Sequence, residues 1–214
     1  MSLRSWLVLA LAVAAIGWWF SPLSPHAPAV AALAPGVDPR CPPPPRVASG
    51  KPPLQSAVPA TLQPFRLAAA QLQPLAGFSV EARVLSRKDY RRGREAQLSP
   101  TDLALGWGAM AARGMAERLD VSQSGRWYRY RWSGEAPLPP REIARSSANM
   151  HLIPADAATA AALRDVRAGE RVRIDGWLVE ADAPDGWRWR SSLSRDDTGA
   201  GACELVYVCA ISRE

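Results

Sequence analysis

The sequence has few of the residues from which metal sites and disulfide frameworks are built. It contains three cysteines and two histidines in 214 residues, and no C-x-x-C pair, so a structural zinc site is not expected. Cys203 and Cys209 fall on one expected strand, about 20 Å apart, which is too far for a mutual disulfide. Cys41 could pair with either one in an exported compartment, and the alternative is that Cys203 and Cys209 are buried free thiols. No cofactor is expected.

The chain also lacks the concentrated positive charge of a nucleic-acid-binding domain. The net charge is +6, but residues 1–77 hold five basic residues and only one acid, which leaves the remainder nearly neutral. Nucleic-acid-binding domains usually present a far more basic face, so we expect no nucleic-acid partner. One basic cluster remains, formed by Arg87, Lys88, Arg91, Arg92 and Arg94. A solvated loop explains this cluster, with a patch for phosphates or headgroups as the alternative.

No apolar run comfortably reaches the roughly 20 residues that a transmembrane helix needs. The longest run extends from Trp6 to Phe20, and Arg4 precedes it. However, Leu3 extends this run, and Trp18 and Trp19 suit the membrane interface. We expect residues 1–20 to be a signal anchor that contacts the inner membrane through residues 3–20 and leaves residues 21–214 in the periplasm. The alternative is a cleaved signal peptide, which would release the chain into the periplasm.

Proline dominates the next segment. Most of the 20 prolines lie between Pro22 and Pro64, with no apolar periodicity around them. Such a composition predicts a disordered, semi-extended tether over residues 21–64. Residues 65–214 are then expected to form a single globular domain.

Alternating apolar residues predict strands in this domain. The predicted strands cover residues 78–84, 127–132, 171–180, 187–193 and 203–211. Residues 99–119 are predicted to be helical, because Ser99 can cap a helix whose first turn holds Pro100. Asp156 is predicted to cap a second helix that runs to Val166. The expected fold is α+β and mostly β: a compact, curved antiparallel sheet or a partly open, OB-like barrel with one or two short helices.

Two segments, residues 145–154 and 191–204, look unlike ordinary connections and carry most of the chemically interesting side chains. His151 with Asp196 or Asp197 is a candidate general base, which would make the protein a hydrolase. Ser147, Ser192 and Cys203 are the candidate nucleophiles. No G-x-S-x-G motif or oxyanion device accompanies them.

Three other interpretations of these segments are open. Oxygen ligands from Asp196, Asp197 and Glu204 could bind a divalent metal, but they match no known loop pattern, and no metal is expected. Side chains beside glycines commonly bond to backbone in tight turns, which predicts a structural network. Its members would be Ser147, Asn149, His151, Arg195, Asp197, Thr198 and Glu204. Trp177, Trp187 and Trp189 could form a stacking platform for sugar or peptide, with core packing as the alternative.

Three motifs resemble a group of uncharacterised bacterial membrane-associated proteins. The first is S-x-N-x-H-L, carried by Ser147, Asn149, His151 and Leu152. The second is carried by Gly169, Glu170, Val172, Ile174, Gly176, Trp177 and Leu178. The third, S-x-x-R-x-D-T-G-x-G-A-C-E, runs from Ser192 to Glu204 and is the most specific. The similarity covers about residues 60–211. Ala148, where a second Asn is common, and Ser191, where Thr is common, depart from the pattern, and the group implies no particular reaction or ligand.

The anchor, the long spacer and the absence of a complete catalytic set favour a non-catalytic envelope protein. We expect its exported β domain to bind a protein partner or an envelope component such as a glycan. An envelope hydrolase using His151 with Asp197 or Asp196 is the alternative function.

Overall fold

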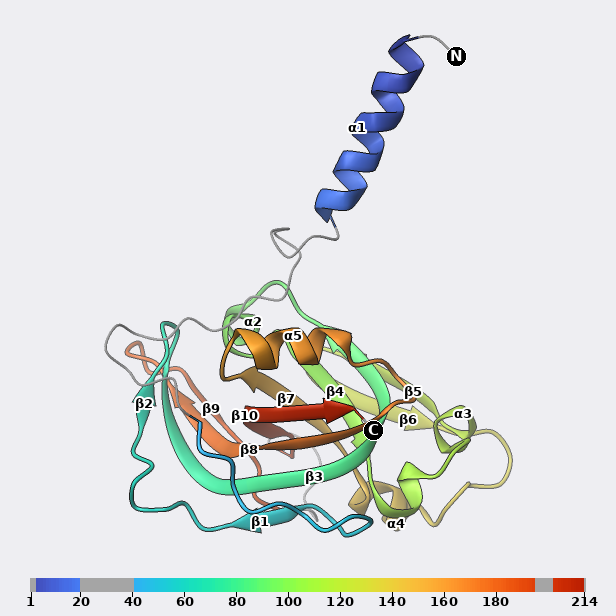
Figure 1. Cartoon of the computed structure of the whole chain (residues 1–214). Coiled ribbons are helices and arrows are strands. Elements are labelled where there is room, and N and C mark those ends of the chain that lie inside the picture. Colours follow the sequence, from blue (N-terminus) through green and yellow to red (C-terminus); the bar gives the residue numbers. More distant parts are fainter. Residues whose placement is uncertain (1–2, 20–40, 195–201, 214) are drawn as a thin grey trace.

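The computed structural model describes residues 3–19, 41–194 and 202–213 (Figure 1). The helices are α1 (Leu3–Trp19), α2 (Arg94–Leu98), the 3-10 helix η1 (Gly108–Ala111), α3 (Met115–Arg118), α4 (Pro140–Arg145) and α5 (Ala157–Asp165). The strands are β1 (Leu54–Ser56), β2 (Phe65–Arg66), β3 (Gln71–Asp89), β4 (Thr101–Gly106), β5 (Asp120–Ser124), β6 (Trp127–Arg131), β7 (Ser147–Pro154), β8 (Arg171–Asp182), β9 (Arg188–Arg190) and β10 (Glu204–Arg213). The expectation of a mostly β chain with a curved sheet is confirmed, although the domain holds more short helices than the one or two predicted.

Five strands close on one another into a ring. Their order is β3-β4-β7-β10-β8, and β8 pairs again with β3. The 19-residue β3 makes closure possible, because its first part pairs with β8 and its last part with β4. Register shifts after Pro74 and after Val84 interrupt these ladders, and bulges of this kind bend a strand. All neighbours in the ring are antiparallel except β7 and β10, which are parallel.

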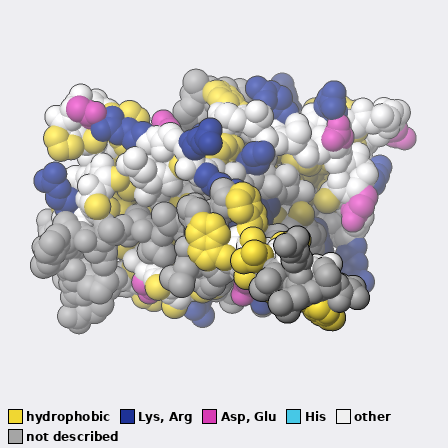
Figure 2. Space-filling view, turned by 90° about the horizontal axis from the view of Figure 1, so that it is seen from above, with side chains coloured by type: hydrophobic (Ala, Val, Ile, Leu, Met, Phe, Trp, Pro, Cys, Tyr) yellow, Lys and Arg dark blue, Asp and Glu magenta, His cyan; other side chains and the backbone are white. Residues whose placement is uncertain are grey.

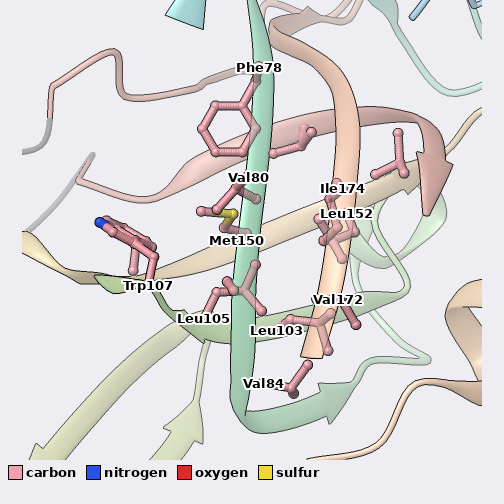
Figure 3. Close-up of a cluster of buried hydrophobic side chains, with 14 of the residues drawn as sticks. Phe78, Val80, Val84, Leu103, Leu105, Trp107, Met150, Leu152, Val172 and Ile174 are labelled. Carbon is pink, nitrogen blue, oxygen red and sulfur yellow. The ribbon is translucent and has the colours of Figure 1, made fainter. Parts of the chain in front are cut away.

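Apolar side chains from all five strands meet inside this ring (Figure 3). Phe78, Leu105, Met150 and Ile174 are among those fully removed from solvent. α5 lies across one end of the barrel (Figure 1) and adds Leu163 to the same core. Its start agrees with the prediction, since the Asp156 carboxylate accepts a hydrogen bond from the Thr159 N–H at 2.7 Å.

Part of the predicted tether packs against the barrel. Residues 41–64 are ordered along its outside, where β1 pairs with β3 and Val47 is buried. Cys41 forms a disulfide with Cys209, and the Trp177 indole N–H donates to the Pro42 carbonyl at 2.9 Å. Gly77 permits the close approach, because a Cβ there would collide with Ser56. Residues 41–64, which the prolines predicted to belong to a tether, therefore pack with the barrel as part of the same folded unit.

Two local predictions are wrong. Residues 99–119 are not one helix: Thr101–Gly106 is strand β4, followed by the short η1 and α3. The segment 145–154, expected to be a loop, is mostly strand β7. β4 and β7 are buried strands that pair with each other, and this pairing between segments far apart in sequence overrides the local signal.

The N-terminal helix α1 has 17 residues and exposes apolar side chains such as Trp6 and Leu11. Within the described residues, no helix combines the length and the apolar character that a membrane crossing requires. The expected N-terminal membrane helix is therefore unsupported by the structure.

Candidate functional site

β7 has two buried faces of opposite character. Ala148, Met150 and Leu152 belong to the interior core of the barrel. The alternate residues Ser147, Asn149 and His151 point to the outside of the wall, yet each is at most 5% exposed. A polar row on the outer wall is therefore hidden from solvent by other elements of the chain. This row is the S-x-N-x-H motif.

Asp102 on β4 lies directly opposite His151 in the ladder and is fully buried. Nδ1 of His151 is 3.0 Å from Oδ1 of Asp102, although the angle is not that of a hydrogen bond. The Asn149 amide lies 3.3 Å from the other carboxylate oxygen. A buried carboxylate is costly unless it is compensated, so this arrangement requires a cation nearby.

Arg126 supplies that cation from the tip of the β5–β6 hairpin. Its guanidinium donates to Oδ1 of Asp102 at 2.6 Å and to the Ser99 carbonyl at 2.9 Å. It also lies over the Tyr90 ring, 3.9 Å from the centroid, and 5.5 Å from that of Trp189. Hydrogen bonds to charged groups in dry surroundings are among the stronger ones, so Arg126 fastens the hairpin to the barrel wall.

The backbone conformation of Arg126 is unusual for a residue other than glycine. Arg126 has φ 70°, and it is the one non-glycine residue with positive φ in the described part of the chain. With Gly125 at φ 58° it makes the two-residue hairpin turn, where Asn-Gly or Gly-Gly is the normal choice. A left-handed conformation costs about 1–2 kcal/mol for such a residue. The contacts of its side chain offset that cost.

The rest of the hairpin covers the polar row residue by residue. The Tyr128 hydroxyl and the Ser147 hydroxyl are 2.6 Å apart, and Ser147 also bonds the Ile143 carbonyl. The Gln123 side-chain amide donates to Oδ1 of Asn149 at 2.7 Å. Burial is the main cause that raises the pKa of Tyr128 to about 12, so this phenol is neutral and able to donate.

Aromatic side chains from β9 close the other edge of the site. The Trp189 ring is 4.8 Å from the His151 ring and 6.1 Å from Trp187. Arg94, from the basic cluster, lies over Trp187 and pairs with Asp185 at 2.6 Å. Trp187 and Trp189 are only partly exposed, and Trp177 is buried. These contacts correspond to core packing and not to an open stacking platform.

The predicted site residues separate into three groups. Ser147, Asn149 and His151 come together under the hairpin. Glu204 is buried but shares its face of β10 with Val206 and Val208, on the inner side of the wall. Arg195, Asp196, Asp197 and Thr198 lie outside the described residues.

Sequence reasoning missed Asp102, Arg126 and Tyr90. Asp102 lies in the segment that was predicted to be helical. The alternation Asp102-Leu103-Ala104-Leu105 was nevertheless a signal for a strand with one polar position. Arg126 follows Gly125 between two alternating runs, which was a signal for a hairpin tip. Nothing local in the sequence indicated that this tip lies on β4.

The cysteines resolve the alternatives left open by their spacing. Cys209 is bonded to Cys41, whereas Cys203 is a partly buried thiol outside that disulfide. Cys203 lies beneath the hairpin, with its sulfur 3.9 Å from the Arg126 carbonyl. Across the described ranges there is no group of three or more His, Cys, Asp and Glu side chains that could hold a metal ion.

Comparisons with known proteins add no family to this geometry. Neither the family models, the curated proteins nor the solved structures contain a match to the chain. The resemblance carried by the three motifs therefore stays a prediction.

Proposed function

We propose that this protein is a non-catalytic module of the cell envelope, held at the inner membrane by residues 3–20, whose periplasmic OB-like domain binds a protein partner. The observation that carries the proposal is the covered polar face. The side chains best suited to chemistry, His151 and Asp102, are enclosed, while the hairpin that encloses them presents an aromatic and basic outer surface.

The connectivity of the ring supports an OB-like description. Such barrels bind their ligands on the face of their second and third strands and through the adjoining loops. In this chain the corresponding strands are β4 and β7, with α5 following β7. The hairpin occupies that face and Trp189 borders it. A partner that approaches this side of the domain therefore meets the hairpin first.

The outer surface of the hairpin has the composition of a protein-binding surface. Trp127 is 40% exposed and Trp132 is 36% exposed, which is high for tryptophan in the domain. Arg129 lies on the same outward face of β6 as Trp127, and the Arg131 side chain is 80% exposed. Trp132 follows the strand and stacks on Tyr130. Tryptophan and arginine dominate the residues that carry binding energy in protein interfaces.

The distribution of charge favours a protein over a nucleic acid. In the view of Figure 2, Lys and Arg side chains are spread among hydrophobic and acidic ones and form no continuous stripe. Part of the basic cluster makes contacts within the domain. Arg87 donates to the Leu163 carbonyl at the end of α5, and Arg94 pairs with Asp185. These arginines are explained by the fold.

Site-specific photo-crosslinking in cells tests the proposal. A photoreactive residue in place of Trp127 should capture a defined envelope protein, and Trp132→Ala should weaken that capture. The matched control position is Thr61, which is exposed and precedes β2 in the sequence. β2 lies on the other side of the barrel from β5 and β6 (Figure 1). Absence of any adduct at position 127, or the same adducts at position 61, would end the proposal.

The alternative function is an envelope hydrolase that uses His151 with Asp197 or Asp196. One contact favours a histidine base, namely the approach of His151 to Asp102. However, Asp102 is also bonded to Arg126, and His151 is 2% exposed beneath Trp189 and the hairpin. A general base must reach its substrate, so the enclosed site supports the binding module better.

A further inference from the structure

At the end of β3 that pairs with β4, the surface holds a cleft of about 440 Å³ between the η1 segment and the turn that precedes β8. Its charged lining consists of Arg83, Arg113, Arg171 and Glu170. We propose that this cleft binds a phosphate-bearing ligand through Arg113 and Arg171. The site is separate from the hairpin surface and does not depend on the function proposed for it.

Arg83 builds one wall of the cleft. Its Nε donates to the Ala111 carbonyl at 2.8 Å and one terminal nitrogen donates to the Gly169 carbonyl at 2.6 Å. These bonds tie the two sides of the cleft together and fix the guanidinium in place. A positive charge that is already held rigidly loses little freedom when an anion binds beside it.

Arg171 has donors that the fold does not satisfy. Its Nε is buried and has no hydrogen-bond partner in the described part of the chain. The nearest carboxylate, that of Glu81, is 3.6 Å from a terminal nitrogen and is bonded more closely by Arg173 at 2.9 Å. The Arg171 side chain is 42% exposed, so its terminal nitrogens remain available to an anion in the cleft.

Among the described residues, Glu170 is the one acid that lines the cleft, and its carboxylate already has other partners. One Glu170 oxygen accepts from the Arg167 backbone N–H at 2.7 Å, and the other lies 3.7 Å from Arg213. Arg113 is exposed at the rim, next to Gly114. Three guanidinium groups therefore face the cleft against a single carboxylate that already has partners.

The arginines that line the cleft indicate the chemical class of the ligand. Guanidinium groups bind phosphate oxygens in bidentate fashion, and several of them favour an anion with oxygens on more than one side. The volume exceeds that of inorganic phosphate, which leaves room for a small attached group. A phosphate monoester or the phosphate of a lipid headgroup provides this shared chemistry.

Titration calorimetry of the purified full-length chain in detergent tests the site. Glycerol phosphate is the soluble probe, and we expect it to bind with a Kd of about 1 mM. The double variant Arg113→Gln/Arg171→Gln should weaken binding by about tenfold or more. Arg173 continues to neutralise Glu81 in this variant, and Arg113→Gln alone, at an exposed position, gives a second readout that does not depend on folding.

The matched control removes two positive charges elsewhere. Arg66→Gln/Arg92→Gln changes two exposed arginines outside the cleft and should leave affinity within about twofold. Equal losses in both double variants, or no binding of glycerol phosphate at about 20 mM, would overturn the soluble site.

Binding to vesicles distinguishes the two sources of the phosphate, which are a phosphate monoester and a lipid headgroup. Chains are bound to phosphatidylcholine vesicles with and without phosphatidylglycerol, and the cleft double variant is compared with the wild type so that the contribution of α1 cancels. A phosphatidylglycerol-dependent gain that the double variant loses assigns the cleft to a lipid headgroup. If neither glycerol phosphate nor phosphatidylglycerol responds to the double variant, the proposal is wrong.

Discussion

The two faces of β7 are equally buried and are held by different forces. The inner face, with Met150 and Leu152, packs against apolar side chains from every strand of the barrel. On the outer face, Asn149 bonds directionally to Gln123 and to the Arg126 carbonyl of the hairpin, and His151 lies beside Asp102 of β4 and Trp189 of β9. Non-directional burial tolerates small shifts of the chain, whereas a polar network is stable only when its members are placed correctly. The inner face therefore accounts for the fold, and the outer face for the position of one hairpin.

The largest effect is expected on the inner face. Met150→Ala removes a fully buried side chain from the core and should lower the free energy of unfolding by about 2–5 kcal/mol. Urea denaturation followed by tryptophan fluorescence measures it. A loss below about 1 kcal/mol would mean that the barrel interior is not the main source of stability.

A smaller effect is expected on the outer face. Asn149→Ala leaves the Gln123 amide without its acceptor and the Arg126 carbonyl without its donor, so we expect a loss of about 1–3 kcal/mol. The same denaturation experiment applies, and hydrogen exchange should show faster exchange in β5 and β6 with β8 unchanged. Equal acceleration in β8 would mean that the two faces are not separable.

The smallest effect at neutral pH is expected for Tyr128→Phe, which removes one hydrogen bond to Ser147 and should cost about 0.5–1.5 kcal/mol. In the wild type, burial raises the pKa of Tyr128 from its ordinary value of 10.0 to about 12. The folded state therefore holds this proton more tightly than the unfolded state. The resulting stability is complete below pH 10 and is lost as the pH rises to about 12.

Phenylalanine cannot ionise, so the stability of Tyr128→Phe should fall less steeply over this window. The gap between the two proteins should narrow or reverse between pH 10 and about 12. A constant gap in urea titrations across this range would show that the phenol is hydrated and not enclosed by the hairpin.

The sequence predicted the elements whose signal is local. The strands predicted at residues 78–84, 127–132 and 171–180 correspond to β3, β6 and β8, and α5 begins at the predicted cap Asp156. The mostly β class followed from these segments. The interpretation of β7 as a loop failed because Ser147, Asn149 and His151 are polar residues in a strand that is buried on both sides. Burial of that outer face comes from the hairpin, which a local pattern does not contain.

Two other features depend on contacts across long sequence separations. The prolines predicted a disordered tether over residues 21–64, whereas residues 41–64 dock on the barrel through the Cys41–Cys209 disulfide and pairing with β3. The candidate site needed Asp102 from β4 and Arg126 from the hairpin, which meet His151 only through the register of the barrel. Residue types in the motif indicated which side chains cluster, and the topology decided their partners.

A double-mutant cycle between Asp102 and Arg126 tests most directly whether this contact holds the hairpin on the barrel. The variants are Asp102→Asn, Arg126→Gln and the two combined, each measured by urea denaturation of the full-length chain. We predict a coupling free energy of at least about 1 kcal/mol, because the carboxylate is fully buried and the guanidinium is its closest donor. Additive losses, with coupling near zero, would contradict the account and show that the hairpin is held by other contacts.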